Sequence, residues 1–227
     1  MKNSLEVIYE DNHIIVVIKP INIPSQGDKS GDIDMLTIVK SYLKEKYNKP
    51  GDVYLGLVHR LDRMVSGLMV FAKTSKAASR ISKDIRENNF KKRYYAIVCG
   101  TLSGSGLLEN YLIKNEKLNK SRVVDNIKDS KLAILEYNVL KNFVYKNSNV
   151  SLVDINLKTG RHHQIRVQFA NIFHPLYGDT KYNNKKVSEN ISLFSYYLSF
   201  FHPTKDEYLE FKIDICDNKY LNEIWRC

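Results

Sequence analysis

The stretch His59-Arg60-Leu61-Asp62-Arg63-Met64-Val65-Ser66-Gly67 sets one carboxylate between two arginines, directly before an apolar run. Opposite charges within a few ångströms favour the ionised form of an acid. We therefore expect Asp62 to stay charged at neutral pH, as a nucleophilic carboxylate must. The same pattern also fits a structural ion pair beside a surface turn, so the charges alone leave both interpretations open.

Apolar runs on either side of this stretch predict its backbone setting. Residues 55–58 form a short apolar run before it, and residues 67–72 form a continuous one after it. Short, continuous apolar runs are typical of buried strands. We therefore place Asp62 in a loop between two strands, with His59 holding that loop by hydrogen bonding.

The remainder of the chain contains many strand-like stretches and few helical ones. Alternating or continuous apolar patterns predict strands at residues 7–9, 14–18, 94–99, 133–139, 153–157, 194–200 and 209–215. Helical spacing predicts helices near residues 36–47 and 77–85, and a short one that begins near Thr159-Gly160 and ends near Ile172. Many strands with few interleaved helices indicate an α+β fold with a mixed, largely antiparallel sheet and flanking helices. No linker or repeat interrupts the pattern, so we expect one domain over residues 1–227.

The composition restricts the partners and the location. There are 35 Lys and Arg residues against 25 Asp and Glu, a formal charge of +10 with a pI near 9.3, which favours a polyanion such as nucleic acid. The three cysteines, Cys99, Cys216 and Cys227, form no disulfide framework or zinc-ligand spacing. No apolar stretch approaches the roughly 18–20 residues that span a bilayer. We expect a cytoplasmic protein without a metal site.

Four further motifs accompany the His59–Gly67 stretch. They are Ile14-Ile15-Val16-Val17-Ile18-Lys19-Pro20, Lys92-Arg93-Tyr94-Tyr95-Ala96, Thr159-Gly160-Arg161-His162-His163-Gln164-Ile165-Arg166-Val167 and His174-Pro175-Leu176-Tyr177-Gly178-Asp179. In residue identity and in order along the chain, these motifs closely resemble those of the RluA-type pseudouridine synthases. The resemblance covers most of residues 7 to 182.

This resemblance implies an isomerase that converts uridine to pseudouridine without a cofactor, on a fold with a central RNA-binding cleft. Asp62 is then the catalytic residue, which attacks C1′ or assists formation of a glycal-like intermediate. Arg166 is its ion-pair partner, and Tyr94 stacks on the base and relays the proton lost from C5. Members of the family often carry an N-terminal S4 domain, but here the pattern starts within the first ten residues, so we expect none.

The resemblance also implies contacts with a structured ribosomal or transfer RNA. The uridine must be flipped out of its stem, and Arg60 is the candidate to fill the gap or to clamp a phosphate. The RNA-binding residues that we expect are Arg60, Arg63, Lys19, Lys92, Arg161, His163 and Gln164. For Lys19, a solvated lysine at the end of a strand is the alternative. We expect a monomer that needs no protein partner.

Three positions depart from the usual family pattern. Val65 stands where many members of the family have Thr. His162 stands where Thr or Ser is usual, and Gln168 stands where His is common. None of them is one of the three catalytic candidates. They therefore bear on the subfamily and the RNA target rather than on the reaction.

Two other functions deserve comparison. A non-catalytic RNA-binding or RNA-folding protein would need no buried carboxylate that repels phosphate, so Asp62, Tyr94 and Arg166 argue against it. A kinase is suggested by the superficial likeness of His59-Arg60-Leu61-Asp62 to a catalytic loop. It fails because the sequence has neither a glycine-rich loop nor an Asp-Phe-Gly element.

Overall fold

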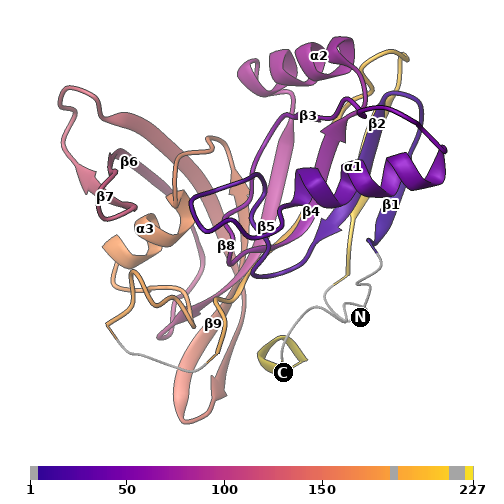
Figure 1. Ribbon diagram of the computed structural model, residues 1–227. Coiled ribbons are helices and arrows are strands. Elements are labelled where there is room, and N and C mark those ends of the chain that lie inside the picture. The colour runs from indigo at the N-terminus through magenta and orange to yellow at the C-terminus, as the bar shows by residue number, and fades with distance from the viewer. Residues whose placement is uncertain (1–4, 185–188, 215–222, 227) are drawn as a thin grey trace. The chain divides into compact units, whose positions relative to one another are not determined.

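The computed structural model describes residues 5–184, 189–214 and 223–226 (Figure 1). The chain forms two compact units, and each unit is built from two separate segments of the sequence. The first unit holds Met1–Lys91 and Tyr197–Ile213, and the second holds Lys92–Tyr196 and Asp214–Cys227.

The first unit is a sheet with two helices. Its elements are β1 (Val7–Glu10), β2 (Ile14–Lys19), α1 (Met35–Lys46), β3 (Gly56–Leu57), β4 (Ser66–Ala72), α2 (Ser75–Arg86), β11 (Tyr208–Lys212) and the end of β10 (Leu193–Phe201). The strand order is β1-β2-β4-β10-β11, with β3 also paired to β4. The β1–β2, β2–β4, β3–β4 and β10–β11 pairs are antiparallel.

Strands β2 and β4 are buried along their whole length, which requires cover on both faces of the sheet. Ala77 and Ile81 of α2 pack with Val16 and Val70 on one face. Helix α1, which lies in front of the strands in Figure 1, buries Met35, Val39 and Leu43. These residues recur every four positions, as one face of a helix requires.

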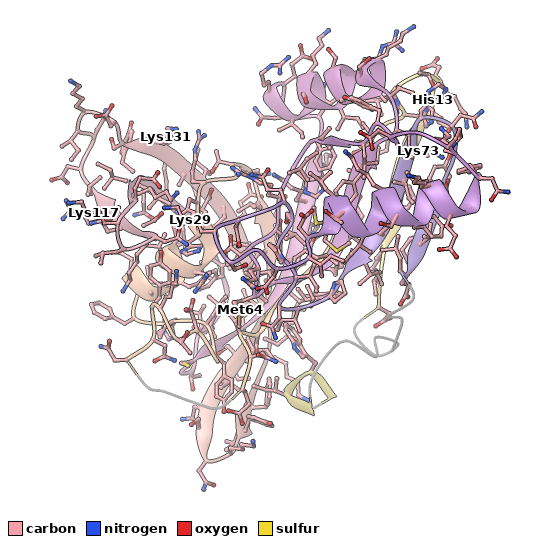
Figure 2. The ribbon with its side chains drawn as sticks, in the orientation of Figure 1. His13, Lys29, Met64, Lys73, Lys117 and Lys131 are labelled. Atoms are coloured by element: carbon pink, nitrogen blue, oxygen red, sulfur yellow. The ribbon has the colours of Figure 1, made fainter. Side chains whose placement is uncertain are left out.

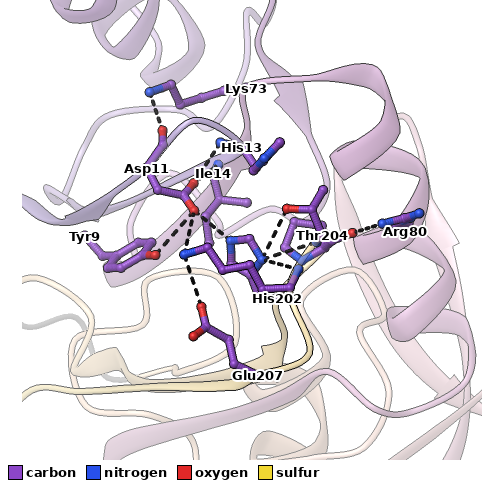
Figure 3. A network of polar contacts seen from close by, with 11 residues as sticks. Tyr9, Asp11, His13, Ile14, Lys73, Arg80, His202, Thr204 and Glu207 are labelled. Carbon is purple, nitrogen blue, oxygen red and sulfur yellow. Dashed lines mark hydrogen bonds and ion pairs between the residues drawn. The ribbon is translucent and has the colours of Figure 1, made fainter.

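A polar network fixes the turn between β1 and β2 (Figure 3). The Asp11 carboxylate accepts hydrogen bonds from the backbone of His13 at 2.7 Å and of Ile14 at 2.8 Å, and contacts His202 Nε2 at 2.7 Å. His202 Nδ1 accepts from the amides of Thr204 and Lys205, so the ring proton lies on Nε2 and is donated to Asp11. The β1–β2 turn is thereby tied to the segment that leads into β11.

The second unit contains β5 (Lys91–Cys99), β6 (Ser105–Asn115), β7 (Lys120–Val124), β8 (Lys131–Tyr145), β9 (Ser148–Leu157), α3 (Gln164–Asn171), the start of β10 and a 3-10 helix (Glu223–Arg226). The strand order is β10-β5-β9-β8-β6-β7. The β5–β9, β8–β9, β6–β8 and β6–β7 pairs are antiparallel. Val167 of α3 packs with Leu112 of β6 and Ala133 of β8.

The structure confirms the α+β class with a mostly antiparallel sheet and corrects some details. Helix α3 begins at Gln164 rather than near Thr159-Gly160, because the Thr159 amide donates to Ile134 O and its hydroxyl to the Gln164 side chain. Strands β6 and β7 were not predicted. Strand β11 ends at Lys212, and residue 215 of the predicted strand lies outside the described residues, as do Cys216 and Cys227.

Lys19 anchors the loop that carries Asp62. Its side chain is fully buried, with 0% exposure. Its ammonium donates to Pro20 O at 2.8 Å, to Ile23 O at 2.6 Å and to Arg63 O at 3.0 Å. The last acceptor follows Asp62 directly. The alternative of a solvated lysine is therefore wrong, and the side chain supports the loop from within the protein.

Burial makes this ammonium sensitive to pH. Burial, opposed by the negative charge of Asp62 and reinforced by the positive charge of Arg63, lowers the pKa of Lys19 to about 7. In the unfolded chain the ordinary value is 10.5. Between these two values the unfolded state binds more protons than the folded state, so this group makes stability rise with pH.

Replacing Lys19 by Met removes this titration and keeps an unbranched side chain. We expect the free energy of unfolding of the native protein to rise relative to Lys19→Met by up to about 1.4 kcal/mol per pH unit between pH 7 and pH 10. Urea unfolding at a series of pH values measures the difference. The control is Lys40→Met on the exposed side of α1, which should follow the native protein. Parallel curves for the native protein and Lys19→Met would contradict the buried titration.

Candidate active site

The backbone on both sides of Asp62 is held by hydrogen bonds to the polar loop that follows β2. Ser25 Oγ donates to Leu61 O at 2.7 Å and accepts from Leu61 N at 3.0 Å. The Asn22 amide donates to Arg63 O at 2.9 Å. With the ammonium of Lys19 on Arg63 O as well, backbone groups of both residues next to Asp62 have fixed partners. The half-buried carboxylate therefore projects from a rigid loop.

The two arginines beside Asp62 in sequence have different surroundings. Arg63 forms ion pairs with Asp32 and with Asp28, and its Nε donates to Asn22 O at 3.2 Å. These ion pairs close the loop of residues 22–34, and a contact of Arg63 with RNA stays a prediction. Arg60 is exposed.

His59 holds the loop as expected. Its Nε2 accepts a hydrogen bond from the Val70 amide at 3.0 Å, and its ring lies 5.4 Å from the ring of Phe90. Because Nε2 accepts, the ring proton lies on Nδ1. The contact with Val70 fixes the approach to Asp62 against strand β4.

In the second unit, Arg166 of α3 is held by a buried carboxylate. Arg166 Nε donates to Asp179 Oδ2 and Nη2 to Asp179 Oδ1, each at 2.8 Å. The two residues are 4% and 2% exposed. Asp179 Oδ1 also accepts from the amides of Lys181 and Tyr182. This bidentate geometry fixes the plane of the guanidinium, as a buried ion pair needs if it is to offset desolvation.

Tyr182 and His163 complete the surroundings of Arg166. The Arg166 Cζ lies 5.2 Å from the centre of the Tyr182 ring, within the range of a cation–π contact. The Tyr182 hydroxyl lies 3.0 Å from His163 Nδ1. Burial, and next the positive charge of Arg166, lower the pKa of His163 to about 2. His163 is therefore neutral at physiological pH.

Two expected RNA contacts in this motif instead have partners inside the protein. Gln164 is 3% exposed; its Oε1 accepts from Thr159 Oγ1 and Arg161 N, and its Nε2 donates to Ile134 O at 3.1 Å. His163 has a left-handed backbone, with φ of 51°, and is 8% exposed. Like Lys19, these side chains indicate a supporting role rather than direct contact with RNA.

Arg161 is exposed, and its Nε donates to Leu132 O at 2.8 Å. Lys92 of β5 is half-buried, and burial lowers the pKa of its ammonium. A Cβ at Gly160 would lie 3.3 Å from Lys92 Nζ. The backbone of Gly160 thus approaches the end of the Lys92 side chain closely.

Tyr94 lies on β5 opposite Ile155 of β9 and is 5% exposed. The next side chains along the strand are also fixed. Arg93 is paired with Asp154, which accepts from the Tyr196 hydroxyl at 2.9 Å, and the rings of Tyr95 and Tyr196 stack 3.8 Å apart. Tyr94 is therefore set in a rigid part of the sheet.

The predicted residues divide between the two units. The first unit holds Asp62 with Lys19, Arg60 and Arg63, and the second holds Tyr94, Lys92, Arg161, His163, Gln164 and Arg166. Within the second unit the structure brings Arg166 and His163 together through Tyr182. Sequence reasoning assigned no role to Asp179 or Tyr182, although Asp179 closes a recognised motif.

Neither a metal cluster nor a membrane-spanning helix is found in the part of the chain that the structure describes. No group of three or more His, Cys, Asp or Glu side chains there could hold a metal ion. No helix there is long and apolar enough to cross a membrane.

Comparison with known proteins gives consistent results. The RNA pseudouridylate synthase family model matches residues 13–171. An Aquifex aeolicus protein described as an uncharacterized RNA pseudouridine synthase is 34% identical over 224 residues, which are 92% of this chain and 69% of the relative. The ribosomal large subunit pseudouridine synthase D of Pasteurella multocida is 32% identical over 187 residues, with 80% of this chain and 53% of the relative covered. Synthase C of Buchnera aphidicola is 29% identical, with 98% and 72% covered. The chain thus spans 53% to 72% of the length of the last two relatives.

Solved structures share the fold. Human RNA pseudouridylate synthase domain containing 4 matches with a TM-score of 0.77 at 20% identity, covering 97% of this chain and 90% of that one. Human RNA pseudouridylate synthase domain containing 1 matches with a TM-score of 0.73 at 22% identity, covering 93% and 83%. With the family match over residues 13–171 and the motifs in their expected order, this chain belongs to the RluA-type RNA pseudouridine synthases, which are isomerases.

Proposed function

We propose that this protein isomerises specific uridines to pseudouridine in structured ribosomal or transfer RNA, with Asp62 as the nucleophile and both units acting as one catalytic domain. The observation that carries the proposal is the rigid loop that presents Asp62, held by Lys19 and Ser25. The relatives named ribosomal large subunit synthases C and D make ribosomal RNA the first candidate.

The reaction conserves all atoms of the nucleotide. The bond from C1′ to N1 breaks, the uracil rotates, and a bond from C1′ to C5 forms, while C5 loses a proton and N1 gains one. Asp62 either adds to C1′ or assists formation of a glycal-like intermediate, and both routes use the same ionised carboxylate. No redox step occurs, so no cofactor is needed.

The other residues are given roles by resemblance. Arg166 is the cationic partner that keeps the nucleophile charged, and Asp179 holds its guanidinium plane. Tyr94 stacks on the uracil, a contact worth about 1–3 kcal/mol, and accepts the proton from C5. Arg60 fills the position that the flipped uridine leaves, or clamps a phosphate beside it.

A non-catalytic RNA-binding protein on the same fold is the competing function. Such a protein gains nothing from a carboxylate fixed in a rigid loop, because that charge repels phosphate. Its biological effect would survive the loss of the Asp62 charge. The two functions therefore differ in the response to one conservative substitution.

A pseudouridine map of ribosomal and transfer RNA from the host tests the proposal. Deletion of the gene should remove one or a few pseudouridines, and the native gene should restore them. Asp62→Asn keeps the size of the side chain but removes the nucleophile, so we expect activity to fall on the order of 10⁴-fold or more and the sites to stay unmodified.

The matched control is Asp52→Asn, at an exposed aspartate of the first unit, which should restore the map fully. Restoration by Asp62→Asn would contradict the proposed nucleophile. A map that does not change on deletion would contradict the proposed ribosomal and transfer RNA substrates and favour the non-catalytic function.

A further inference from the structure

We propose that the β6–β7 hairpin docks the phosphate backbone of the substrate RNA, and that its contact with Tyr182 makes the position of Arg166 depend on this docking. The inference rests on the proposed function, since it takes RNA as the substrate. It assigns substrate recognition to a part of the chain that carries none of the family motifs.

Positive charge is concentrated in the hairpin and the loop after it. Residues 114–131 hold six Lys or Arg and three Asp or Glu residues, a net charge of +3 in 18 residues. Lys114 is paired with Glu116 at 2.6 Å. Within the described residues, Lys117, Arg122 and Lys131 are exposed and form no ion pair. Cations without partners attract phosphate and release its counterions on binding.

The hairpin presents these cations at the edge of the second unit. Strand β7 comes last in the strand order, and Lys120 and Arg122, two residues apart, lie on the same face of it. Lys117 lies in the connection between β6 and β7, and Lys131 starts the neighbouring strand β8 (Figure 2). Lysines on an edge strand also discourage the addition of another strand. That role would not require hydrogen bonds between this hairpin and the residues before α3.

Side-chain hydrogen bonds do connect the hairpin to the residues before α3. Ser121 Oγ donates to His162 O at 2.8 Å and lies 2.9 Å from His162 Nδ1. Asn119 Oδ1 lies 3.0 Å from His162 Nε2. Ser121 is 3% exposed, so its contacts are protected from water. They fix the position of the hairpin relative to α3.

The same hairpin residue reaches the surroundings of Arg166. The Ser121 amide donates to the Tyr182 hydroxyl at 2.7 Å, and the Tyr182 ring lies against the Arg166 guanidinium. Lys120 Nζ lies 4.9 Å from the centre of the same ring. A displacement of β7 therefore moves the hydroxyl end of Tyr182 and with it one wall of the Arg166 site. Tyr182 is a positioning residue in this scheme.

Neutralising two hairpin cations tests the docking. In Lys117→Gln/Arg122→Gln, we expect the plot of log Kd against log salt to become less steep by about 0.7–0.9 for each phosphate that the variant no longer neutralises. The probe is an in vitro transcript of the host large-subunit ribosomal RNA, titrated in a series of KCl concentrations. The control, Lys40→Gln/Lys44→Gln on α1, removes the same charge from exposed positions and should leave the slope unchanged.

Equal slopes for the hairpin variant and the native protein would overturn the docking. An equal change of slope in the α1 variant would also overturn it, because net charge alone would then explain the salt dependence. The series is repeated in Asp62→Asn, where no product forms. A hairpin effect that persists there supports docking independently of catalysis. Disappearance of the effect there would contradict it.

Tyr182→Phe tests the coupling, because it keeps the ring and removes the hydroxyl. We expect an unchanged Kd for the transcript, and a single-turnover rate at saturating RNA that falls about tenfold or more, as small misplacements of a positioned group do. In Tyr182→Phe, the hairpin substitutions should have no further effect on this rate. Tyr137→Phe, whose ring packs against Phe169 in the same unit, should behave as the native protein.

Additive effects of Tyr182→Phe and the hairpin substitutions on the rate would overturn the coupling, since independent sites add. A fall in affinity without a fall in rate would also overturn it. A native protein that forms no pseudouridine in the transcript contradicts the proposed function and with it the coupling. The salt series tests the docking in either case.

Discussion

The loop that presents Asp62 depends on the burial of one ammonium group. Lys19 ends a fully buried strand and donates to three backbone carbonyls, the last of them Arg63 O, 44 residues further along the chain. A buried cation is unfavourable unless hydrogen bonds and an opposite charge compensate it. Here the carbonyls supply the bonds and Asp62 supplies the charge. The folded chain therefore gains most when the loop lies as it does, with its carboxylate near Lys19.

The second unit also contains a buried charge that hydrogen bonds compensate, but this charge is negative. The buried charge is the Asp179 carboxylate, which accepts two donors from Arg166 and two backbone amides. These four bonds fix the turn that carries Tyr182 as well as the guanidinium plane. In both units, one buried ion organises a turn and orients a residue to which the proposed function gives a catalytic role. Rigid support of this kind favours a reaction that depends on positioning rather than on a cofactor.

Local patterns predicted what depends on local interactions. The strands around Asp62, the helices α1 and α2 and the role of His59 followed from apolar spacing and from the motif. The partners of Arg63 lie more than 30 residues away in sequence, at Asp28 and Asp32, and no spacing indicates them. Asp11 and His202 are separated by 191 residues. Strands β6 and β7 were missed because polar residues such as Glu109, Asn110 and Lys120 interrupt the apolar alternation on which strand prediction relies.

Position 162 shows what a departure from the family pattern can add. Where Thr or Ser is usual, His162 offers two ring nitrogens, and both lie at hydrogen-bond distance from the hairpin, one from Ser121 Oγ and one from Asn119 Oδ1. A Ser or Thr side chain offers a single hydroxyl oxygen in place of the two ring nitrogens. His162 thus ties the segment before α3 to a hairpin outside the motifs at two points. Under the proposed function, we therefore expect variation at this position to bear on RNA docking rather than on the reaction at Asp62.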